Sequence, residues 1–370
     1  MSSEYARERK VATVAVQHAS ILTKSVMRSI SHVSKTDSTP VTVADFAVQA
    51  LLISTLRHAF PSDSFLGEES AAALRQDAQL RQQVWVLIST VGNFQQVGEQ
   101  EPVLFKPKSP EDMVECIDLG GAGTGGRSGR VWVMDPIDGT ATFIEGGQYA
   151  VALALLEDGK EVVGVVGCPN LAMDMDCLED APLDDKGNGF MASAVRGDGG
   201  VLLQSISAGE LSSGQFVSSA QRKQDESRLM SLKELNIVDS TLGEEYHLKQ
   251  SQQFADWTGQ NKFPGTDVWS AQLRLIIIAL GRNDYNNIQL RIPRAKEEDG
   301  TEDPENYIWD YAGAHLILNE AGGVASDLDG KDIDFGTGRR LSANWGLVAA
   351  AHDRLHAQVL GKVQEFLAAA

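Results

Sequence analysis

Two aspartates lie close together in the stretch 131–143, which reads VWVMDPIDGTATF. The apolar residues 131–134 predict a buried strand that ends in a turn at Asp135 and Pro136. Such a turn places the side chains of Asp135 and Asp138 on one side, where two carboxylates repel each other unless a cation lies between them. A hard divalent cation with oxygen ligands is the usual partner, so the stretch predicts a magnesium site.

The same residues allow a purely structural interpretation. Aspartate and glycine are common in turns, so Asp138 and Gly139 could form one without binding anything. Gly139 also gives the backbone freedom needed just before a helix, which we expect to begin at Thr140. The choice between the two interpretations depends on the other acidic residues of the chain.

Glu68 and Glu69 follow a short apolar segment. Adjacent side chains point in different directions on most backbones, so we expect at most one of the two to share a site with Asp135. Both glutamates also suit the start of a helix that we expect from Ser70 onward, because the helix dipole favours acidic residues there.

Asp45 and Asp310 each lie near the expected start of a helix. Asp45 belongs to a helix that opens at Pro40, and with Thr42 it resembles a capping box, so a capping role alone would account for it. Asp310 opens a helix rich in alanine and leucine, whose first turn favours an acidic residue with or without a metal.

Apolar periodicity predicts a chain of mixed helices and strands. The polar segment that begins at Ser205 predicts a division into two lobes, residues 1–205 and 206–370. The expected elements are helices over about 1–30, 40–60 and from 109, hairpins of 149–156 with 161–167 and of 189–195 with 200–203, a helix near 227–235, a helix capped by Thr266 or Asp267, strands at 288–292, 324–326 and 347–350, and helices from 309 and over 353–367.

Composition excludes several classes of partner. The chain has 370 residues, 42% of them hydrophobic and 22% charged, which is typical of a globular protein with a large core. A formal net charge of −19 opposes binding to nucleic-acid polymers and anionic membranes.

No stretch reaches the roughly 18 apolar residues of a membrane span. The three cysteines show no C-x-x-C pairing, so we expect a reducing compartment, the cytoplasm or the nucleus.

A glycine-rich stretch at 121–126, GAGTGG, fits the dinucleotide pattern G-x-G-x-x-G but lacks its context, because a strand follows and no apolar strand precedes it. We expect a loop, with Arg127 and Arg130 near enough for contact with a substrate phosphate. The motifs of serine hydrolases, zincins and P-loop NTPases are absent from the sequence.

Three motifs occur together in order: GEES at 67–70, DPIDGT at 135–140 and WDYAGA at 309–314. In this order they resemble the lithium-sensitive inositol monophosphatase superfamily, and most closely the 3′(2′),5′-bisphosphate nucleotidases of fungi and plants. The resemblance extends to 40–45, 125–130 and 167–171. It implies a layered αβαβα fold, with an α+β lobe that carries most metal ligands and a smaller α/β lobe.

The resemblance also implies roles for individual residues. It implies two Mg²⁺ ions, with a third, looser ion, and as ligands Glu68, Asp135, the carbonyl of Ile137, Asp138 and Asp310. Asp45 with Thr140 would orient and deprotonate the attacking water. The residues implied to bind substrate are Gly139, Thr140 and Ala141 through their N–H groups, and His247, Ser270, Arg274 and Arg291.

The substrate-contacting positions depart from the pattern of similar nucleotidases. Those enzymes usually continue after DPIDGT with Lys-Gly-Phe, whereas this chain has Ala141 and Thr142 and so loses a cation beside the phosphate. Tyr311 stands where histidine is common, and Arg274 where a lysine is expected.

The implied activity is Mg²⁺-dependent removal of the 3′-phosphate from adenosine 3′,5′-bisphosphate, or from its sulfated form. The expected partner is a small phosphorylated substrate, and inhibition by lithium is implied by the resemblance alone. Two alternatives follow from the departures. The chain could be a phosphatase of inositol polyphosphates or another metabolite, or a repurposed metal-binding homologue with a non-hydrolytic function. The sequence does not indicate the oligomeric state.

Overall fold

The structure is a computed structural model of the chain. It describes residues 4–30, 39–91, 104–173, 183–184, 187–207, 211–222, 231–242, 245–260, 262–281, 286–293 and 306–369. Side chains at positions 29–30, 39–42, 221–222 and 245–248 lie outside this description, and so does Cys177.

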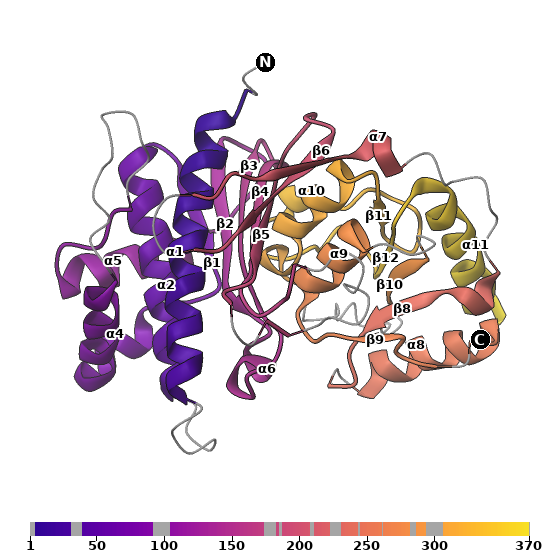
Figure 1. Cartoon of the computed structure of the whole chain (residues 1–370), viewed down its shortest axis with the longest axis horizontal. Helices are drawn as coiled ribbons and strands as arrows, with labels where there is room; N and C mark the ends of the chain where they lie inside the picture. Colours follow the sequence, from indigo (N-terminus) through magenta and orange to yellow (C-terminus); the bar gives the residue numbers. More distant parts are fainter. Residues whose placement is uncertain are drawn as a thin grey trace.

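The described elements form five layers, which are seen edge-on in Figure 1. The first layer consists of helices α1 (Ala6–Ile30), α2 (Thr39–Ala59), α3 (Ala72–Gln76), α4 (Ala78–Thr90) and α5 (Pro110–Gly121). Helices α9 (Ala271–Leu280) and α10 (Ala312–Glu320) lie between two sheets, and helices α8 (Glu245–Thr258) and α11 (Asp353–Ala369) cover the far side. This arrangement confirms the predicted αβαβα fold.

The first sheet has seven described strands in the order β1-β2-β3-β4-β5-β6-β7. Their bounds are β1 (Ser64–Gly67), β2 (Arg130–Asp138), β3 (Ala150–Glu157), β4 (Lys160–Cys168), β5 (Phe190–Val195), β6 (Gly200–Ser205) and β7 (Gln215–Ser218). Among the described strands of this sheet, β1 and β2 form the one parallel pair, and the two predicted hairpins are confirmed as β3–β4 and β5–β6. Central strands read as continuous apolar runs because α1 and α2 cover one face and α10 the other.

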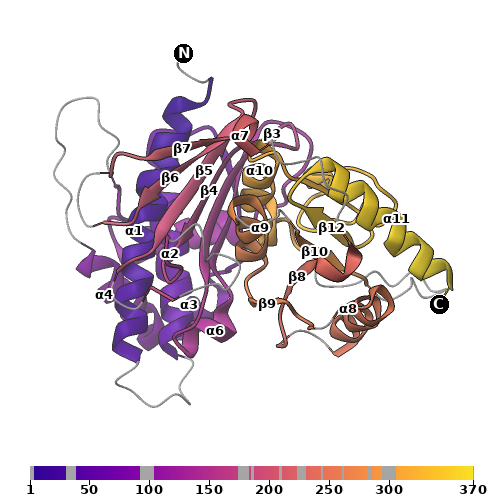
Figure 2. The ribbon, with the colours of Figure 1, turned by 45° about the vertical axis from the view of Figure 1, so that its right-hand side comes forward.

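The second sheet has five described strands in the order β11-β12-β10-β8-β9. Their bounds are β8 (Asn236–Asp239), β9 (Thr266–Asp267), β10 (Asn287–Arg291), β11 (Val324–Ser326) and β12 (Leu347–Ala350). Figure 2 shows α9 and α10 between this sheet and the first one. Strand β7 belongs to the first sheet although it follows residue 205, and the expected division of the chain into lobes at that residue stays a prediction.

Short elements complete the description. They are α6 (Thr140–Ile144), α7 (Ser219–Arg222) and the 3₁₀ turns η3 (Leu232–Glu234), η4 (Ile308–Asp310) and η5 (Phe335–Thr337). The helix predicted near 227–235 is wrong over its described part, because residues 232–234 form η3 and the next residues enter β8. Residues 227–230 lie outside the described ranges.

The start of α9 also differs from the prediction. Thr266 and Asp267 form strand β9, and Ser270 caps the helix, with its Oγ accepting a hydrogen bond from the N–H of Leu273 at 3.1 Å. The expected cap was therefore wrong by three or four positions.

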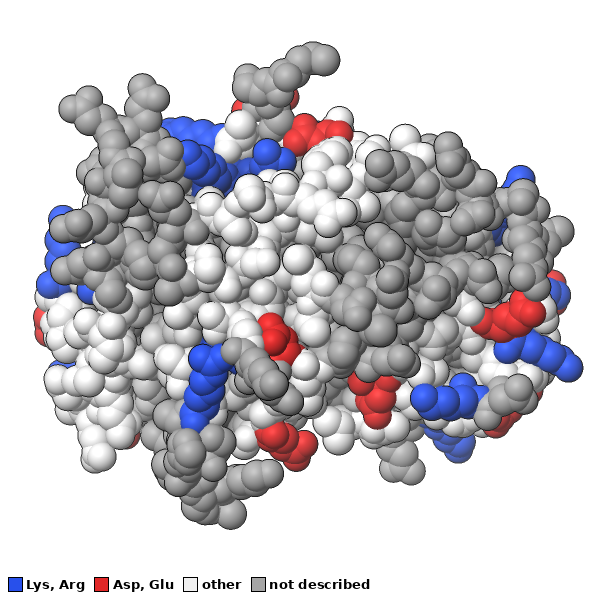
Figure 3. Space-filling view, in the orientation of Figure 1, with Lys and Arg blue, Asp and Glu red and all other residues white. Residues whose placement is uncertain are grey.

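Charge on the described surface is mixed. On the face shown in Figure 3, acidic and basic side chains occur in small separate groups between uncharged areas. Cys116 and Cys168 are buried free thiols. Within the described residues, each helix is either too short or too polar to cross a membrane.

Candidate active site

Strand register brings the first two acidic residues together. Gly67, the last residue of β1, pairs with Met134 of the parallel strand β2, so the next residues along the two strands are Glu68 and Asp135. Their side chains share a hydrogen bond, and Asp135 is only 3% exposed. Two carboxyl groups from different strands thus meet at one end of the sheet.

The sequence predicts that strand β2 ends at Asp135 and Pro136, and this prediction is wrong. The strand continues to Asp138, with a register shift against β3 between Asp135 and Asp138, and proline is tolerated at such an irregularity. The carboxylate of Asp138 accepts hydrogen bonds from the Oγ of Ser270 at 2.5 Å and from the N–H of Gln272 at 2.7 Å. Asp138 therefore joins the first sheet to the N-terminus of α9.

Asp310 reaches the same place from η4. Its Oδ2 accepts a hydrogen bond from the N–H of Tyr307 at 3.2 Å, which fixes the side chain within the turn. Burial, followed by the charges of Asp138 and Glu68, holds the pKa of Asp310 well above its usual range, while Arg291 opposes the shift. Asp310 thus lies within electrostatic range of residues more than 170 positions earlier in the chain.

Asp45 approaches from α2. The helix begins at Thr39, so Asp45 lies beyond its first turn, and capping does not explain the residue. Burial, followed by the charges of Glu69 and Glu68, holds the pKa of Asp45 well above its usual range.

Glu69 is the acidic residue that the sequence did not assign to the site. Burial and the charge of Glu68 raise the pKa of Glu69 to about 7. Its N–H donates to the Oε1 of Gln49 at 2.9 Å, and its carbonyl accepts from the Nε2 of Gln49 at 2.7 Å. The charge of Glu68 acts on Asp135, whereas that of Glu69 acts on Asp45 and is not among the causes that shift the pKa of Asp135. The expectation that at most one of the two glutamates shares a site with Asp135 stays a prediction.

Asp135 is at the centre of this group. Burial, followed by the charges of Glu68, Asp138, Asp310 and Asp45, holds its pKa well above the usual range. Its Oδ1 is buried without a hydrogen-bond partner, which is costly unless a cation fills that role. Burial raises the pKa of Glu68 and the charge of Asp138 adds to the rise, while the hydrogen bond with Asp135 opposes it.

The donor set fits a hard divalent cation, since it consists of carboxylate oxygens with an unpartnered one at the centre. Among the described residues, no three His, Cys, Asp or Glu side chains already stand in a metal-binding arrangement. Binding an ion would therefore require the carboxylates to turn toward it, and the positive charge of the ion would offset their mutual repulsion.

Gly139 adopts a left-handed conformation with φ of 97° and begins α6, so the N–H groups of Thr140 and Ala141 lie at its first turn. The hydroxyl of Thr140 donates to the carbonyl of Ile137 at 3.0 Å. Within the described contacts, no hydrogen bond joins Thr140 to Asp45, the pair implied by the resemblance.

Three of the substrate-contacting residues implied by the resemblance, Ser270, Arg274 and Arg291, lie at the N-cap of α9, within α9 and on β10. Ser270 is fully buried. Its Oγ donates a hydrogen bond to the carboxylate of Asp138 and accepts one from the N–H of Leu273 as the cap of α9. Arg274 forms an ion pair with Asp239 at 3.2 Å and donates to the carbonyl of Val268 at 2.8 Å. The side chain of His247 lies outside the described residues.

The charges of Arg274 and of Arg291 on β10 both reach the acidic group, Arg274 acting on Asp138 and Arg291 on Asp310. Arg291 hydrogen-bonds with the side chain of Tyr311, and its charge opposes the rise in the pKa of Asp310. The substrate roles of Ser270, Arg274 and Arg291 stay predictions.

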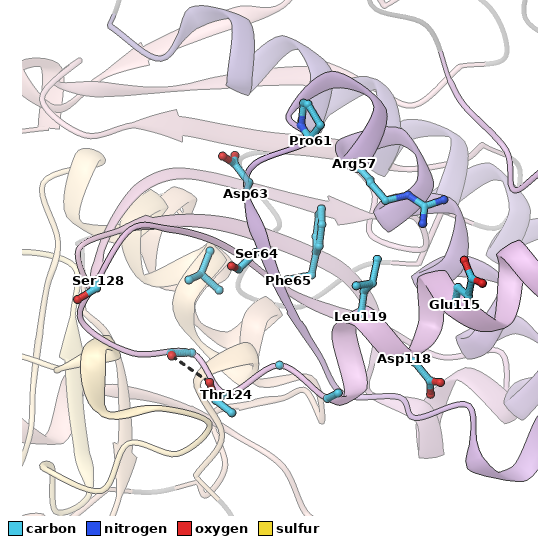
Figure 4. Close-up of a pocket in the computed structure, with 14 residues that line it drawn as sticks. Arg57, Pro61, Asp63, Ser64, Phe65, Glu115, Asp118, Leu119, Thr124 and Ser128 are labelled. Carbon is cyan, nitrogen blue, oxygen red and sulfur yellow. Dashed lines mark hydrogen bonds between the residues drawn. The ribbon is translucent and has the colours of Figure 1, made fainter.

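Figure 4 shows a surface pocket of about 790 Å³. It is lined by Ser64 and Val131, at the starts of β1 and β2, whereas Glu68 and Asp135 lie toward the ends of those strands. Its lining residue Asp63 is paired with Arg130 at 3.0 Å. The pocket is not part of the acidic site.

We expect Gly67→Ala to destabilise the protein and distort the site. A Cβ at Gly67 would lie 2.6 Å from the Cδ of Gln49, which is fully buried and cannot move without losing its hydrogen bonds to Glu69 and Ile117. The expected loss is about 2–3 kcal/mol in the free energy of unfolding, measured by urea titration. Gly361→Ala is the matched control, because its Cβ would meet no atom within 4 Å in helix α11. An equal effect of both substitutions would contradict this account.

Comparison with known proteins agrees with the fold. A model described as the inositol monophosphatase family matches residues 6–368. The chain is 37% identical over 358 residues to a protein of Emericella nidulans named 3′(2′),5′-bisphosphate nucleotidase, with 94% of each chain covered. A Schizosaccharomyces pombe protein of the same name is 36% identical over 351 residues, covering 93% of this chain and 91% of the other.

Solved structures show the same fold at lower identity. An inositol monophosphatase from Zymomonas mobilis superposes with a TM-score of 0.56 at 16% identity, covering 98% of this chain and 99% of the other. SuhB from Mycobacterium tuberculosis gives a TM-score of 0.54 at 19% identity, covering 98% of each chain. With a family model matched over nearly the whole length, and relatives above 30% identity, the chain belongs to the inositol monophosphatase family of metal-dependent phosphatases.

Proposed function

We propose that this protein is a Mg²⁺-dependent phosphatase that removes the 3′-phosphate of adenosine 3′,5′-bisphosphate or its sulfated form. The observation that carries the proposal is the convergence of carboxylates around Asp135, whose Oδ1 is buried without a partner. The named activity of the Emericella nidulans and Schizosaccharomyces pombe relatives supports the substrate.

The ligands proposed for Mg²⁺ are Glu68, Asp135, the carbonyl of Ile137, Asp138 and Asp310. When bound, Mg²⁺ supplies positive charge for the phosphoryl oxygens and lowers the pKa of water. Oδ1 of Asp138 would face the ion, because it accepts only one longer hydrogen bond, from the N–H of Ala271 at 3.3 Å, whereas those from Ser270 and Gln272 go to Oδ2. Register pairing of β1 with β2 holds Glu68 beside Asp135, so two of the ligands are positioned by the sheet itself.

The attacking water would be oriented by Asp45 and Thr140. Burial is the largest cause of the raised pKa of Asp45, and burial favours acceptance of a proton from water whether or not an ion neutralises the nearby glutamates. Thr140 would have to release the carbonyl of Ile137 to take part, and that carbonyl would then be available as a ligand. N–H groups of Gly139, Thr140 and Ala141 would bind the phosphate oxygens.

A comparison of substrates tests the proposal. We expect release of phosphate from adenosine 3′,5′-bisphosphate in the presence of Mg²⁺, with kcat/KM at least roughly tenfold above that for inositol phosphates, a gap of about 1.4 kcal/mol in transition-state binding. Phosphate release would be followed with each substrate at equal Mg²⁺. Equal or faster turnover of inositol phosphates would favour the alternative substrate class. No turnover of any of them, despite Mg²⁺ binding, would reject hydrolysis.

A further inference from the structure

The guanidinium of Arg339 connects three segments beside the acidic site. Arg339 follows η5 and is half-buried. Its Nη1 donates to the carbonyls of Gly121 at 3.1 Å and Gly123 at 2.9 Å, and its Nη2 donates to the carbonyl of Gly67 at 3.3 Å. Gly67 directly precedes Glu68, so the hydrogen bond from Nη2 holds the backbone next to a proposed Mg²⁺ ligand.

The face of the same guanidinium lies against the residue before Asp310. The Cζ of Arg339 is 4.7 Å from the ring centroid of Trp309, and Trp309 stacks on Tyr307 with centroids 4.4 Å apart and planes 9° apart. The main chain adds a further contact, since the N–H of Ile308 donates to the carbonyl of Arg339 at 3.1 Å. Arg339 is thus fixed to η4 by its side chain and by its backbone.

Charge neutralisation does not account for this arrangement. Arg339 is not among the main causes that shift the pKa of Glu68 or of Asp310. The three side-chain hydrogen bonds described for Arg339 all go to backbone carbonyls, and its planar face lies against Trp309. The planar fork of arginine provides this combination, and lysine, with a single ammonium group, does not.

We infer that Arg339 is a positioning residue, which fixes the spacing between Glu68 on the first sheet and Asp310 on η4 so that both reach the same Mg²⁺ site. The inference rests on the proposed function in one respect, because it takes these two carboxylates to be Mg²⁺ ligands. Residues that orient metal ligands without touching the ion commonly change metal affinity by about 10–100-fold when replaced.

The test is Arg339→Lys, with Arg340→Lys as its matched control. Arg340 is the next residue and lies over Tyr307 at 5.1 Å, but its side-chain hydrogen bond goes to the Tyr307 hydroxyl instead of to backbone beside a ligand. Mg²⁺ binding is measured by calorimetry on the full chain, and thermal unfolding is measured without metal. We expect Arg339→Lys to weaken Mg²⁺ binding by about tenfold, and Arg340→Lys to change it less than about twofold.

In activity assays we expect Arg339→Lys to raise the Mg²⁺ concentration for half-maximal rate by about the same factor, with a smaller fall in kcat at saturating Mg²⁺. Unchanged Mg²⁺ affinity in a folded Arg339→Lys protein would overturn the inference and leave the proposed function intact. Weaker Mg²⁺ binding in a protein that hydrolyses none of the phosphates would support the inference and reject the function. Absence of Mg²⁺ binding by the unaltered protein would reject both.

Arg339→Gln provides a second variant, since its amide can donate to carbonyls but carries no charge and no guanidinium face. It should show the same loss of Mg²⁺ affinity as Arg339→Lys. If neither variant folds, Arg339 stabilises the fold as a whole, and the narrower positioning role is overturned.

Discussion

Asp135→Asn is expected to reduce phosphate hydrolysis by roughly a thousandfold or more. The substitution removes the charge of the carboxylate that four other acidic residues surround, and with it a proposed ligand. A metal ion contributes several kcal/mol to stabilising a phosphoryl transition state, and about 4 kcal/mol corresponds to a thousandfold in rate. The measurement is kcat/KM at saturating Mg²⁺.

The same substitution should raise the melting temperature of the metal-free protein. Asparagine has nearly the shape of aspartate, but it carries no charge for Glu68, Asp138 and Asp310 to repel. Activity and metal-free stability should therefore change in opposite directions. Asp198→Asn is the control, because Asp198 is partly exposed on the β5–β6 turn and pairs with Arg9. Loss of stability together with activity would indicate that Asp135 is a structural residue.

The second large effect concerns pH and metal removal. Burial and like charge raise the pKa of Asp45, Asp135 and Asp310 in the folded protein, and that of Glu69 to about 7. In the interval between the ordinary and the raised pKa, the folded state binds more protons than the unfolded state. Stability of the metal-free protein should therefore fall as pH rises from about 4 toward 7.

Bound Mg²⁺ should remove this fall, because the cation favours the ionised carboxylates. We expect the difference in melting temperature between samples with Mg²⁺ and with EDTA to grow by roughly 5 °C or more between pH 5 and pH 8. Buried His18 has a pKa lowered to about 4, which makes stability rise with pH instead. Its contribution is the same with and without metal, so it cancels in the difference. A difference that stays constant or shrinks with rising pH would contradict the account.

Local pattern predicted the elements that carry the site better than it predicted their ends. The apolar runs of β3 and β4 identified a hairpin because each strand is buried on both faces. The end of β2 was missed because a register irregularity lets Pro136 remain in the strand. The cap of α9 was missed because Ser270 is fixed by a distant carboxylate, Asp138, which local sequence does not show.

The site was predicted as a set of motifs and not as a geometry. The order of the three motifs indicated Glu68, Asp135 and Asp310 by resemblance, but neighbouring strands are determined by long-range packing, which no short stretch encodes. Helix α8 was missed because its apolar residues are few, although Phe254 and Ala255 are buried. Arg339 had no sequence signal, since its role depends on three backbone segments that meet only in the fold.

The most direct test of the central claim is diffraction from crystals grown with Mn²⁺ in place of Mg²⁺. Anomalous scattering would locate the ions independently of any assay of activity. The account predicts peaks within about 2.3 Å of carboxylate oxygens of Asp135, with Glu68 or Asp310 among the other ligands. Peaks elsewhere on the protein, or none near Asp135 at saturating Mn²⁺, would contradict it.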